Sequence, residues 1–198
     1  MQKTNERDVL ITAFDMFMKN VYNKTTTKNI AEECGINEST LFRKYNSKKA
    51  LFHAAIEYNF TNSIQLDFDT FDYSGSMNDC LNRMLLSIFK LLCSTIPTYR
   101  LLIKVNLVDD SLLLFIKEKI ESYKSIYINY FDGLKSRYSI VDLDSSTIIN
   151  MQFGTLFSEV FKLDSSNITN LEVMKESIQP YLLQLNRIME KYKNECEI

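Results

Sequence analysis

The chain has 198 residues, of which 45% are hydrophobic and 24% charged, and a net charge of −2. This composition is typical of a globular protein with one or two domains, and no run approaches the roughly 18 apolar residues of a membrane span. The first ten residues also lack the apolar segment of a secretion signal. We therefore expect a cytoplasmic protein that has no contact with a membrane.

The cysteine and histidine content argues against a metal centre. Cys34, Cys80, Cys93 and Cys196 lie far apart, and the chain has one histidine. Such a set forms no familiar zinc pattern and is typical of reduced thiols in a cytoplasmic protein. We expect no metal and no cofactor.

Four Gly, two Pro and apolar spacings of three and four residues predict an all-α fold. The first helix is expected over about 5–20, and Gly35 is expected to end the second helix, where a left-handed backbone costs nothing. The first three helices are expected to follow the capping residues Asn5, Thr26 and Asn37. The fourth helix is expected to start near Ser47 and to run to about 60.

The rest of the chain continues as long helices. Acidic, Ser and Gly residues over 67–76 predict a loop. Pro97 is expected to separate two helices, and Pro180 to kink or divide the last one. The later helices are expected over about 77–95, 98–108, 111–138, 145–163 and 170–193, which gives about nine in all.

Basic residues gather near the start of the chain. Residues 1–50 hold nine Lys or Arg against six Asp or Glu, a net charge of +3, whereas 51–198 carry −5. Within this region, TTTKNIAEECGINESTLFRKYNSKKALF places two short helices around Gly35. That is the layout of a helix-turn-helix, whose second helix enters the major groove of DNA. The alternative is an ordinary turn between helices beside a solvated basic face.

The stretch VLITAFDMF…TTTKNIAEECGINESTLFRKYNSKKALF, over about residues 9–52, resembles the N-terminal domain of the TetR family of bacterial transcriptional repressors. The chain has Val21 where the family usually has Gly, and Phe42 where many members have a Tyr that reaches a phosphate. Positions that agree with the family signature are Ala13, Phe17, Thr25, Thr26, Ile30, Ala31, Gly35, Ile36, Thr40, Leu41, Ser47, Lys48 and Leu51.

The resemblance implies a helix-turn-helix domain over 1–46 and a larger effector-binding and dimerisation domain over 47–198, with the helix from about 47 shared by both. Glu38 suits the helix dipole and the amino group of a cytosine but repels phosphate, so the sequence assigns it no base. Leu41 and Tyr45 are expected to pack inward. The expected DNA contacts are Thr26, Thr27, Lys28, Asn37, Ser39, Thr40, Phe42, Arg43, Lys44 and Lys48.

Apolar residues recur at spacings of three and four along 145–163 and 170–193, as in a heptad pattern. Each stripe either faces its own core or joins a second copy in a four-helix bundle, and the resemblance implies the second arrangement. The expected dimer interface consists of Phe153, Leu156, Val160, Ile178, Tyr181, Leu185 and Ile188.

The middle helices are rich in aromatic side chains, which at helical spacing usually form a simple core. The resemblance implies that some of them line a pocket for a small effector, which the scarcity of charges on these faces predicts to be mostly apolar. The expected pocket residues are Phe60, Phe89, Cys93, Tyr99, Ile103, Tyr123, Tyr127 and Phe153.

The expected function is therefore a ligand-responsive repressor that binds a palindromic operator as a dimer and is released by its effector. The alternative is a helical dimeric interaction module without regulated DNA binding. An enzyme is not expected, because the lone His53 has no Ser or Cys near it in sequence that it could activate.

Overall fold

The computed structural model describes residues 5–64, 66, 71–105, 109–164 and 166–193, with every side chain there except that of Val21. The predicted all-α fold is confirmed, since the described residues form helices and no strand. Parts of two predictions, the loop at 67–70 and the helix end at 106–108, lie outside the described residues, as does Cys196. The helices are α1 (Glu6–Lys24), α2 (Thr27–Glu33), α3 (Glu38–Tyr45), α4 (Lys48–Ser63), α5 (Met77–Lys104), α6 (Asp110–Arg137), α7 (Ser145–Lys162) and α8 (Leu171–Lys193).

The early helices begin where the sequence predicted. The side chain of Thr26 accepts a hydrogen bond from the amide of Asn29, and that of Asn37 accepts from the amide of Ser39. Ser47 caps α4 in the same way. Asn5 occupies the cap position of α1, but its side chain makes no capping bond. Short polar residues therefore fix the starts of α2, α3 and α4 by satisfying amides of the first turn.

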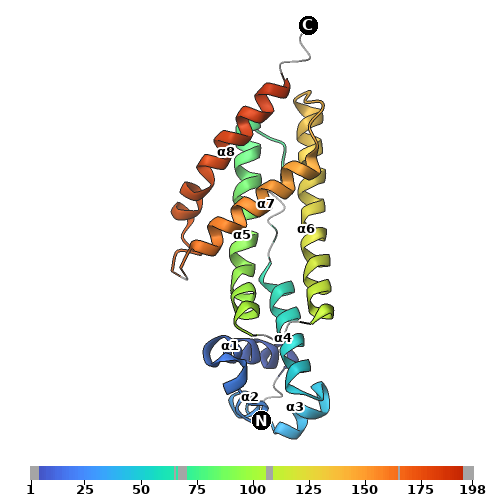
Figure 1. Ribbon diagram of the computed structural model, residues 1–198, viewed down its shortest axis with the longest axis vertical. Helices are drawn as coiled ribbons and strands as arrows, with labels where there is room; N and C mark the ends of the chain where they lie inside the picture. Colours follow the sequence, from blue (N-terminus) through green and yellow to red (C-terminus); the bar gives the residue numbers. More distant parts are fainter. Residues whose placement is uncertain (1–4, 65, 67–70, 106–108, 165, 194–198) are drawn as a thin grey trace. The chain divides into compact units, whose positions relative to one another are not determined.

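The first of two compact units comprises Met1–Ile64 and Pro97–Glu118. Within it α1 packs against α4, and α2 packs against both α1 and α3 (Figure 1). The rings of Phe17 and Phe52, both fully buried, meet edge to face with centroids 5.2 Å apart. Ile30 and Leu41 bring the short helices α2 and α3 onto this core, since both are buried. Burial of such side chains is what stabilises helices too short to form alone.

The second unit comprises Gln65–Ile96 and Lys119–Ile198. In it α7 packs against α8, and large apolar side chains such as Phe89 and Phe131 are fully buried. One buried polar pair lies among them: the hydroxyls of Ser87 and Tyr127 are 2.8 Å apart, so each satisfies the other. The sequence predicted two domains by function, one over 1–46 for DNA binding and one over 47–198 for effector binding and dimerisation. The two compact units are defined by contacts instead, so the predicted domains stay a prediction.

The predicted break at Pro97 is wrong, because α5 runs without interruption from Met77 to Lys104. Pro97 removes one backbone hydrogen bond from the helix. Ile96 and Leu101 on either side of it are almost completely buried, and packing of this kind outweighs the lost bond. Pro180 likewise does not divide α8, which continues from Leu171 to Lys193.

Helix α5 also corrects the expectation about apolar segments. By length and composition alone it is apolar enough to cross a membrane. More than half of its most apolar window is buried inside the protein, which is the usual situation of a core helix in a globular domain.

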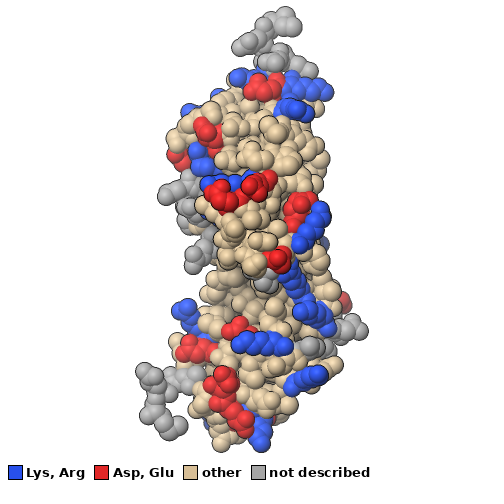
Figure 2. All heavy atoms as spheres, turned by 90° about the vertical axis from the view of Figure 1, so that its left-hand side faces the viewer, with Lys and Arg blue, Asp and Glu red and all other residues tan. Residues whose placement is uncertain are grey.

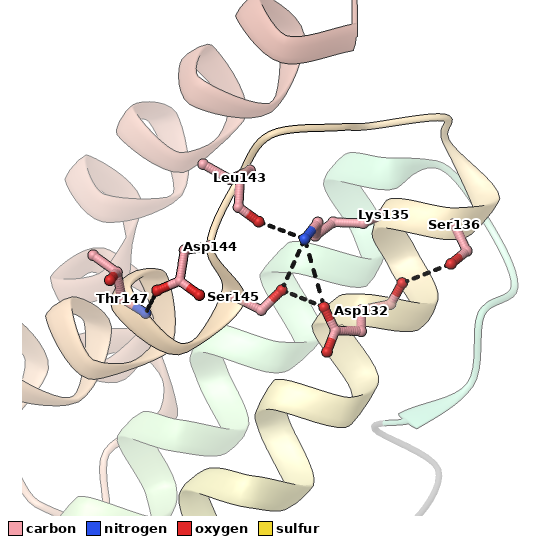
Figure 3. Close-up of polar contacts among 7 residues, drawn as sticks. All are labelled: Asp132, Lys135, Ser136, Leu143, Asp144, Ser145 and Thr147. Carbon is pink, nitrogen blue, oxygen red and sulfur yellow. Dashed lines mark hydrogen bonds and ion pairs between the residues drawn. The ribbon is translucent and has the colours of Figure 1, made fainter.

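A polar network joins the end of α6 to the start of α7 (Figure 3). The ammonium of Lys135 donates to the carbonyl of Leu143 and to Ser145 Oγ, and it lies 3.6 Å from Asp132 Oδ1. Ser145 in turn donates to Asp132. Asp144 caps α7 by accepting from the amide of Thr147 at 2.8 Å. The buried carbonyl of Leu143 and the buried hydroxyl of Ser145 therefore both have hydrogen-bond partners.

Candidate nucleic-acid interface

The turn between α2 and α3 is closed by a glycine in the left-handed conformation. Gly35 has a φ of 64°. Its amide donates to the Glu32 carbonyl at 3.0 Å, and the amide of Ile36 donates to the Ala31 carbonyl at 2.9 Å. This pair of bonds is the Schellman arrangement, in which glycine occupies the position that a Cβ would disfavour. The predicted glycine turn is therefore present and fixes how α3 follows α2.

Helix α3 buries a narrow face and exposes the rest. Leu41 is buried and Tyr45 half-buried, as the sequence predicted for these two residues. The ring of Phe42, in contrast, is 59% exposed. The other predicted contact residues of α3 and its cap are all exposed: Asn37, Ser39, Thr40, Arg43 and Lys44. The helix thus presents a mostly polar outer surface with one aromatic ring.

A hydrogen bond joins the first residues of α2 and α3. Thr27 Oγ1 donates to Glu38 Oε1 at 2.7 Å. Thr26 and Lys28 beside it are exposed, and Thr27 is half-buried. The structure therefore brings the N-terminal ends of α2 and α3 together. In DNA-binding proteins of this layout, the N-terminal end of the second helix contacts base edges.

Two of the predicted phosphate contacts are paired with carboxylates. The ammonium of Lys44 lies 2.7 Å from a carboxylate oxygen of Glu6, at the start of α1. Lys28 lies 4.0 Å from Glu32, and both side chains are well exposed, so this pair is weak. Arg43 makes no ion pair with any other described residue. The cations of this surface are thus partly neutralised within the chain.

Lys48 lies over an aromatic ring at the start of α4. Its Nζ is 4.1 Å from the ring centroid of Tyr22, and that ring stacks on Phe17 and meets Phe52 edge to face. Partial burial lowers the pKa of the Lys48 ammonium below its usual value. The cation is therefore held in place by a ring that the core of the first unit fixes.

The charge on one face of the molecule is mixed. On the face that Figure 2 shows, Lys and Arg side chains alternate in small groups with Asp and Glu, and no extended basic area appears. The net charge of +3 over residues 1–50 therefore does not appear as one basic area on this face.

Sequence reasoning missed the partners of these cations. Glu6 and Tyr22 were not predicted to take part, because each lies more than 20 residues from the lysine that it contacts. Spacing rules apply to neighbours on one helix and carry no information about such pairs. The contact between Thr27 and Glu38 was missed because these residues lie on different helices, where no spacing rule applies.

The predicted effector residues divide between the two units. In the first unit the rings of Phe60 and Tyr99 meet edge to face, with centroids 6.1 Å apart. In the second unit Tyr127 and Phe153 make the same kind of contact at 5.6 Å. Ile103 is 71% exposed and contributes to no core. Phe89 is fully buried, Cys93 is 3% exposed, and Tyr123 is half-buried.

An apolar groove lies beside Cys93 on the second unit. It has a volume of about 390 Å³ and is lined by α5, the α7–α8 connection and α8. Its lining includes Lys90, Ile168, Leu171 and Met174. Burial raises the pKa of the Cys93 thiol to about 12, so that this side chain is neutral and apolar in character. The other predicted effector residues do not line this groove.

The residues predicted to form the dimer interface lie mostly inside their own chain, and the interface itself stays a prediction. A side chain with no exposed surface cannot contact a second copy, and four of the seven are fully buried in their own chain. The stripes of α7 and α8 face inward because these helices pack against each other. The fully buried residues are Leu156, Val160, Ile178 and Leu185, Phe153 is 5% exposed, and Tyr181 and Ile188 are half-buried.

The outer faces of α7 and α8 carry a different apolar set. Met151, Phe161 and Leu183 are between 41% and 59% exposed. Gly154 lies between the first two on α7, and a Cβ placed there would meet no atom within 4 Å. No contact with the described residues therefore explains why this helix position lacks a side chain. Along α8 a shallow groove is lined by Pro180, Leu183, Gln184, Arg187, Ile188 and Lys191.

The acidic side chains and the histidine do not form a metal site. Among the described residues no group of three or more His, Cys, Asp or Glu side chains could hold a metal ion. His53 Nε2 lies 3.7 Å from Asp109, and Asp109 pairs with Lys49 at 2.8 Å. This cluster links α4 to the start of α6 within the first unit.

Comparison with known proteins matches the N-terminal region to one family. Residues 9–55 match the model of bacterial regulatory proteins, tetR family. The uncharacterized HTH-type transcriptional regulator YvkB of Bacillus subtilis (strain 168) is 37% identical over 62 residues, which cover 31% of this chain and 32% of that protein. The matched part thus spans about a third of that relative.

Solved structures share the fold over most of the chain. The transcriptional regulator FadR from Bacillus subtilis, in complex with stearoyl-CoA, has a TM-score of 0.63 and 17% identity, and covers 89% of this chain and 95% of its own. AibR, in complex with isovaleryl coenzyme A and operator DNA, has a TM-score of 0.61 and 14% identity, and covers 90% and 96%. At such identities the likeness is one of fold.

Proposed function

We propose that this chain, whose residues 9–55 match the model of bacterial regulatory proteins, tetR family, is a dimeric transcriptional repressor that binds a palindromic operator. A small apolar effector releases it from the DNA. The observation that carries this proposal is the junction of α2 and α3. Their N-terminal ends meet through Thr27 and Glu38 and present exposed polar side chains.

In this function α3 lies in the major groove with its N-terminal end on the base edges. Asn37, Ser39 and Thr40 face bases or nearby phosphates. Thr26 contacts the DNA backbone, and Thr27 lies beside it with its hydroxyl on Glu38. Arg43, Lys28, Lys44 and Lys48 neutralise phosphates and release counterions. Lys44 exchanges part of its contact with Glu6 for a phosphate, so the free protein already holds this ammonium in position. Phe42 contributes an apolar contact and no phosphate hydrogen bond.

Two copies are needed to read two half-sites about 34–36 Å apart or a multiple of that distance. The outer faces of α7 and α8 suit this contact because they expose Met151, Phe161 and Leu183 around Gly154, where a second helix can approach closely. Four helices, two from each copy, would then form the interface. This replaces the buried residues that the sequence indicated with exposed ones on the same helices.

The effector is proposed to be an acyl compound, because proteins of the same fold were solved with stearoyl-CoA and with isovaleryl coenzyme A. The groove beside Cys93 offers apolar walls for an acyl chain, and Lys90 among its lining residues brings a positive charge that suits an anionic ligand. The protein binds and does not catalyse, in line with the regulatory family that it matches. Binding of chromosomal DNA would place its action in the cytoplasm.

Selection of bound fragments from genomic DNA, followed by gel-shift assays, tests the proposal. The chain should enrich fragments with two inverted half-sites, and a variant with Lys28, Arg43, Lys44 and Lys48 all changed to Ala should not shift them. If the parent protein enriches nothing, or if the quadruple variant binds as well as the parent, the interaction module without regulated DNA binding is the better account.

Release by the effector has its own test. Stearoyl-CoA added to the operator complex should free the DNA and raise the melting temperature of the protein, since a ligand that binds the folded state stabilises it. Cys93→Trp, which fills the groove, should weaken that response and leave operator binding intact. Equal release from the Trp variant would contradict the assignment of the groove.

A further inference from the structure

The carboxylate of Glu38 is in an unusual position for a surface that is proposed to face DNA. Glu38 is the first residue of α3 and is exposed. An ionised carboxylate repels phosphate groups, so its presence there weakens binding to DNA in general. It makes no ion pair with any described residue that would cancel its charge. Glu38 therefore suits a DNA-binding face only if another interaction of its carboxylate offsets the repulsion from phosphates.

The carboxylate is also held in one orientation. Thr27 Oγ1 donates to Glu38 Oε1 at 2.7 Å, across the junction between two helices. Thr27 is half-buried, whereas Glu38 is exposed, so the threonine is the better fixed of the two. One carboxylate oxygen thus has a partner within the chain, and the other remains available to accept a hydrogen bond.

We propose that Glu38 reads a cytosine in the operator and that Thr27 is its positioning residue. The inference rests on the proposed DNA-binding function and adds the base that this side chain selects. In the major groove the pyrimidine edge of cytosine offers only the N4 amino donor, whereas guanine and thymine offer acceptors that repel a carboxylate. Adenine offers a donor beside an acceptor, which suits an amide better than a carboxylate.

The helix dipole gives Glu38 a second benefit, because a negative charge in the first turn stabilises the helix. That benefit is independent of the DNA sequence. A structural role alone would therefore change stability and general affinity and leave base preference unaltered. Base preference is the measurement that separates the two roles.

The experiment is selection of binding sites from a pool of random duplexes with the full-length chain and its variants. The parent should enrich sites with cytosine at one position of each half-site, by about tenfold over other bases. Glu38→Gln should shift that position to adenine, because a glutamine amide pairs with both the donor and the acceptor of adenine. Every other position should keep its preference.

Two further comparisons test the positioning role and the effect of charge. Thr27→Val removes the hydroxyl and keeps the shape, so cytosine enrichment should fall severalfold, and Thr27→Ser should restore it. Glu33→Gln removes an exposed carboxylate at the end of α2. It should raise general affinity about as much as Glu38→Gln does and leave base preference unchanged.

The possible failures are distinguishable. If the Glu38→Gln variant selects the same sites as the parent, Glu38 reads no base and the inference is overturned while DNA binding stands. If the parent enriches no sequence at all, the proposed function fails and the inference fails with it. Unchanged cytosine enrichment in Thr27→Val would overturn the positioning role of Thr27.

Discussion

The ammonium of Lys48 lies 4.1 Å from the ring centroid of Tyr22, which places a cation at the N-terminal end of α4 without any acidic partner in the contact. A ring holds the ammonium in position and leaves its charge available to a phosphate. We predict that Lys48→Ala weakens binding to all DNA sequences alike. It should also lower the slope of log affinity against log salt concentration by about one unit per protomer.

Tyr22 supports this contact indirectly. Tyr22→Leu should reduce affinity less than Lys48→Ala does, without a change of base preference, and Tyr22→Phe should behave as the parent because the ring remains. Lys175→Ala, on α8, is the control for the loss of one positive charge. An unchanged salt slope for Lys48→Ala, measured by fluorescence anisotropy at several salt concentrations, would remove Lys48 from the set of phosphate contacts.

Two leucines on α8 make a matched pair for the dimer. Leu183 is 59% exposed, and Leu185 is fully buried. Leu183→Asp should give a folded monomer with weakened operator binding, since the charge falls on the proposed interface. Leu185→Asp should prevent folding, because an unpaired buried charge costs several kcal/mol, on the order of the whole stability of a domain.

Light scattering measures the first outcome, and circular dichroism the second. Leu183→Asp should keep the helical signal and the thermal transition of the parent. A dimer that persists in this variant would place the interface away from the outer face of α8.

The network around Lys135 should contribute measurable stability. Lys135→Met removes the donor that bonds Leu143 and Ser145, and it leaves Asp132 without its cation. Loss of partners for buried polar groups typically costs about 1–3 kcal/mol. The free energy of unfolding in urea should fall by that amount. Lys175→Met breaks an exposed ion pair on α8 and should change the free energy of unfolding by less than about 1 kcal/mol. If Lys135→Met and Lys175→Met have equal effects, the network around Lys135 adds no stability.

The sequence predicted features whose signals are local. Thr26 and Asn37 cap their helices, and Gly35 adopts the left-handed turn, because each depends on residues within one helical turn. It did not predict that α5 continues through Pro97, since that outcome depends on packing of residues far apart in the chain. It also could not tell whether the apolar stripe on α8 faces its own core or a second copy, and the burial of Leu185 shows that this residue faces the core.

The candidate site divides in the same way. Exposure of Ser39, Thr40 and Arg43 follows from helix periodicity once Leu41 is placed in the core. The contact between Glu6 and Lys44 joins residues on different helices, and no spacing rule predicts it. Position along the chain thus indicated which residues face outward, and only the fold indicated how their charges are paired.

The carboxylate of Asp109 gives the last prediction, which concerns pH. It pairs with Lys49 at 2.8 Å, accepts from the hydroxyl of Ser111 at 2.7 Å, and caps α6 through the amide of Leu112. The bond from Lys49 and that from Ser111 hold the pKa of this carboxyl well below its usual range. Because the unfolded state then takes up a proton at higher pH than the folded state, Asp109 contributes stability above the unfolded pKa of about 3.9 and loses it as pH falls further.

Asp109→Asn should accordingly lower the melting temperature at pH 7, and the difference from the parent should shrink as pH falls below about 4. Thermal unfolding followed by circular dichroism between these pH values measures it. Asp110→Asn is the matched control: Asp110 is the exposed neighbour in the first turn of α6, so its change should have a small effect. The difference in melting temperature between Asp109→Asn and the parent could instead stay constant down to acid pH. In that case the shape of the Asp109 side chain, and not its charge paired with Lys49, accounts for its role.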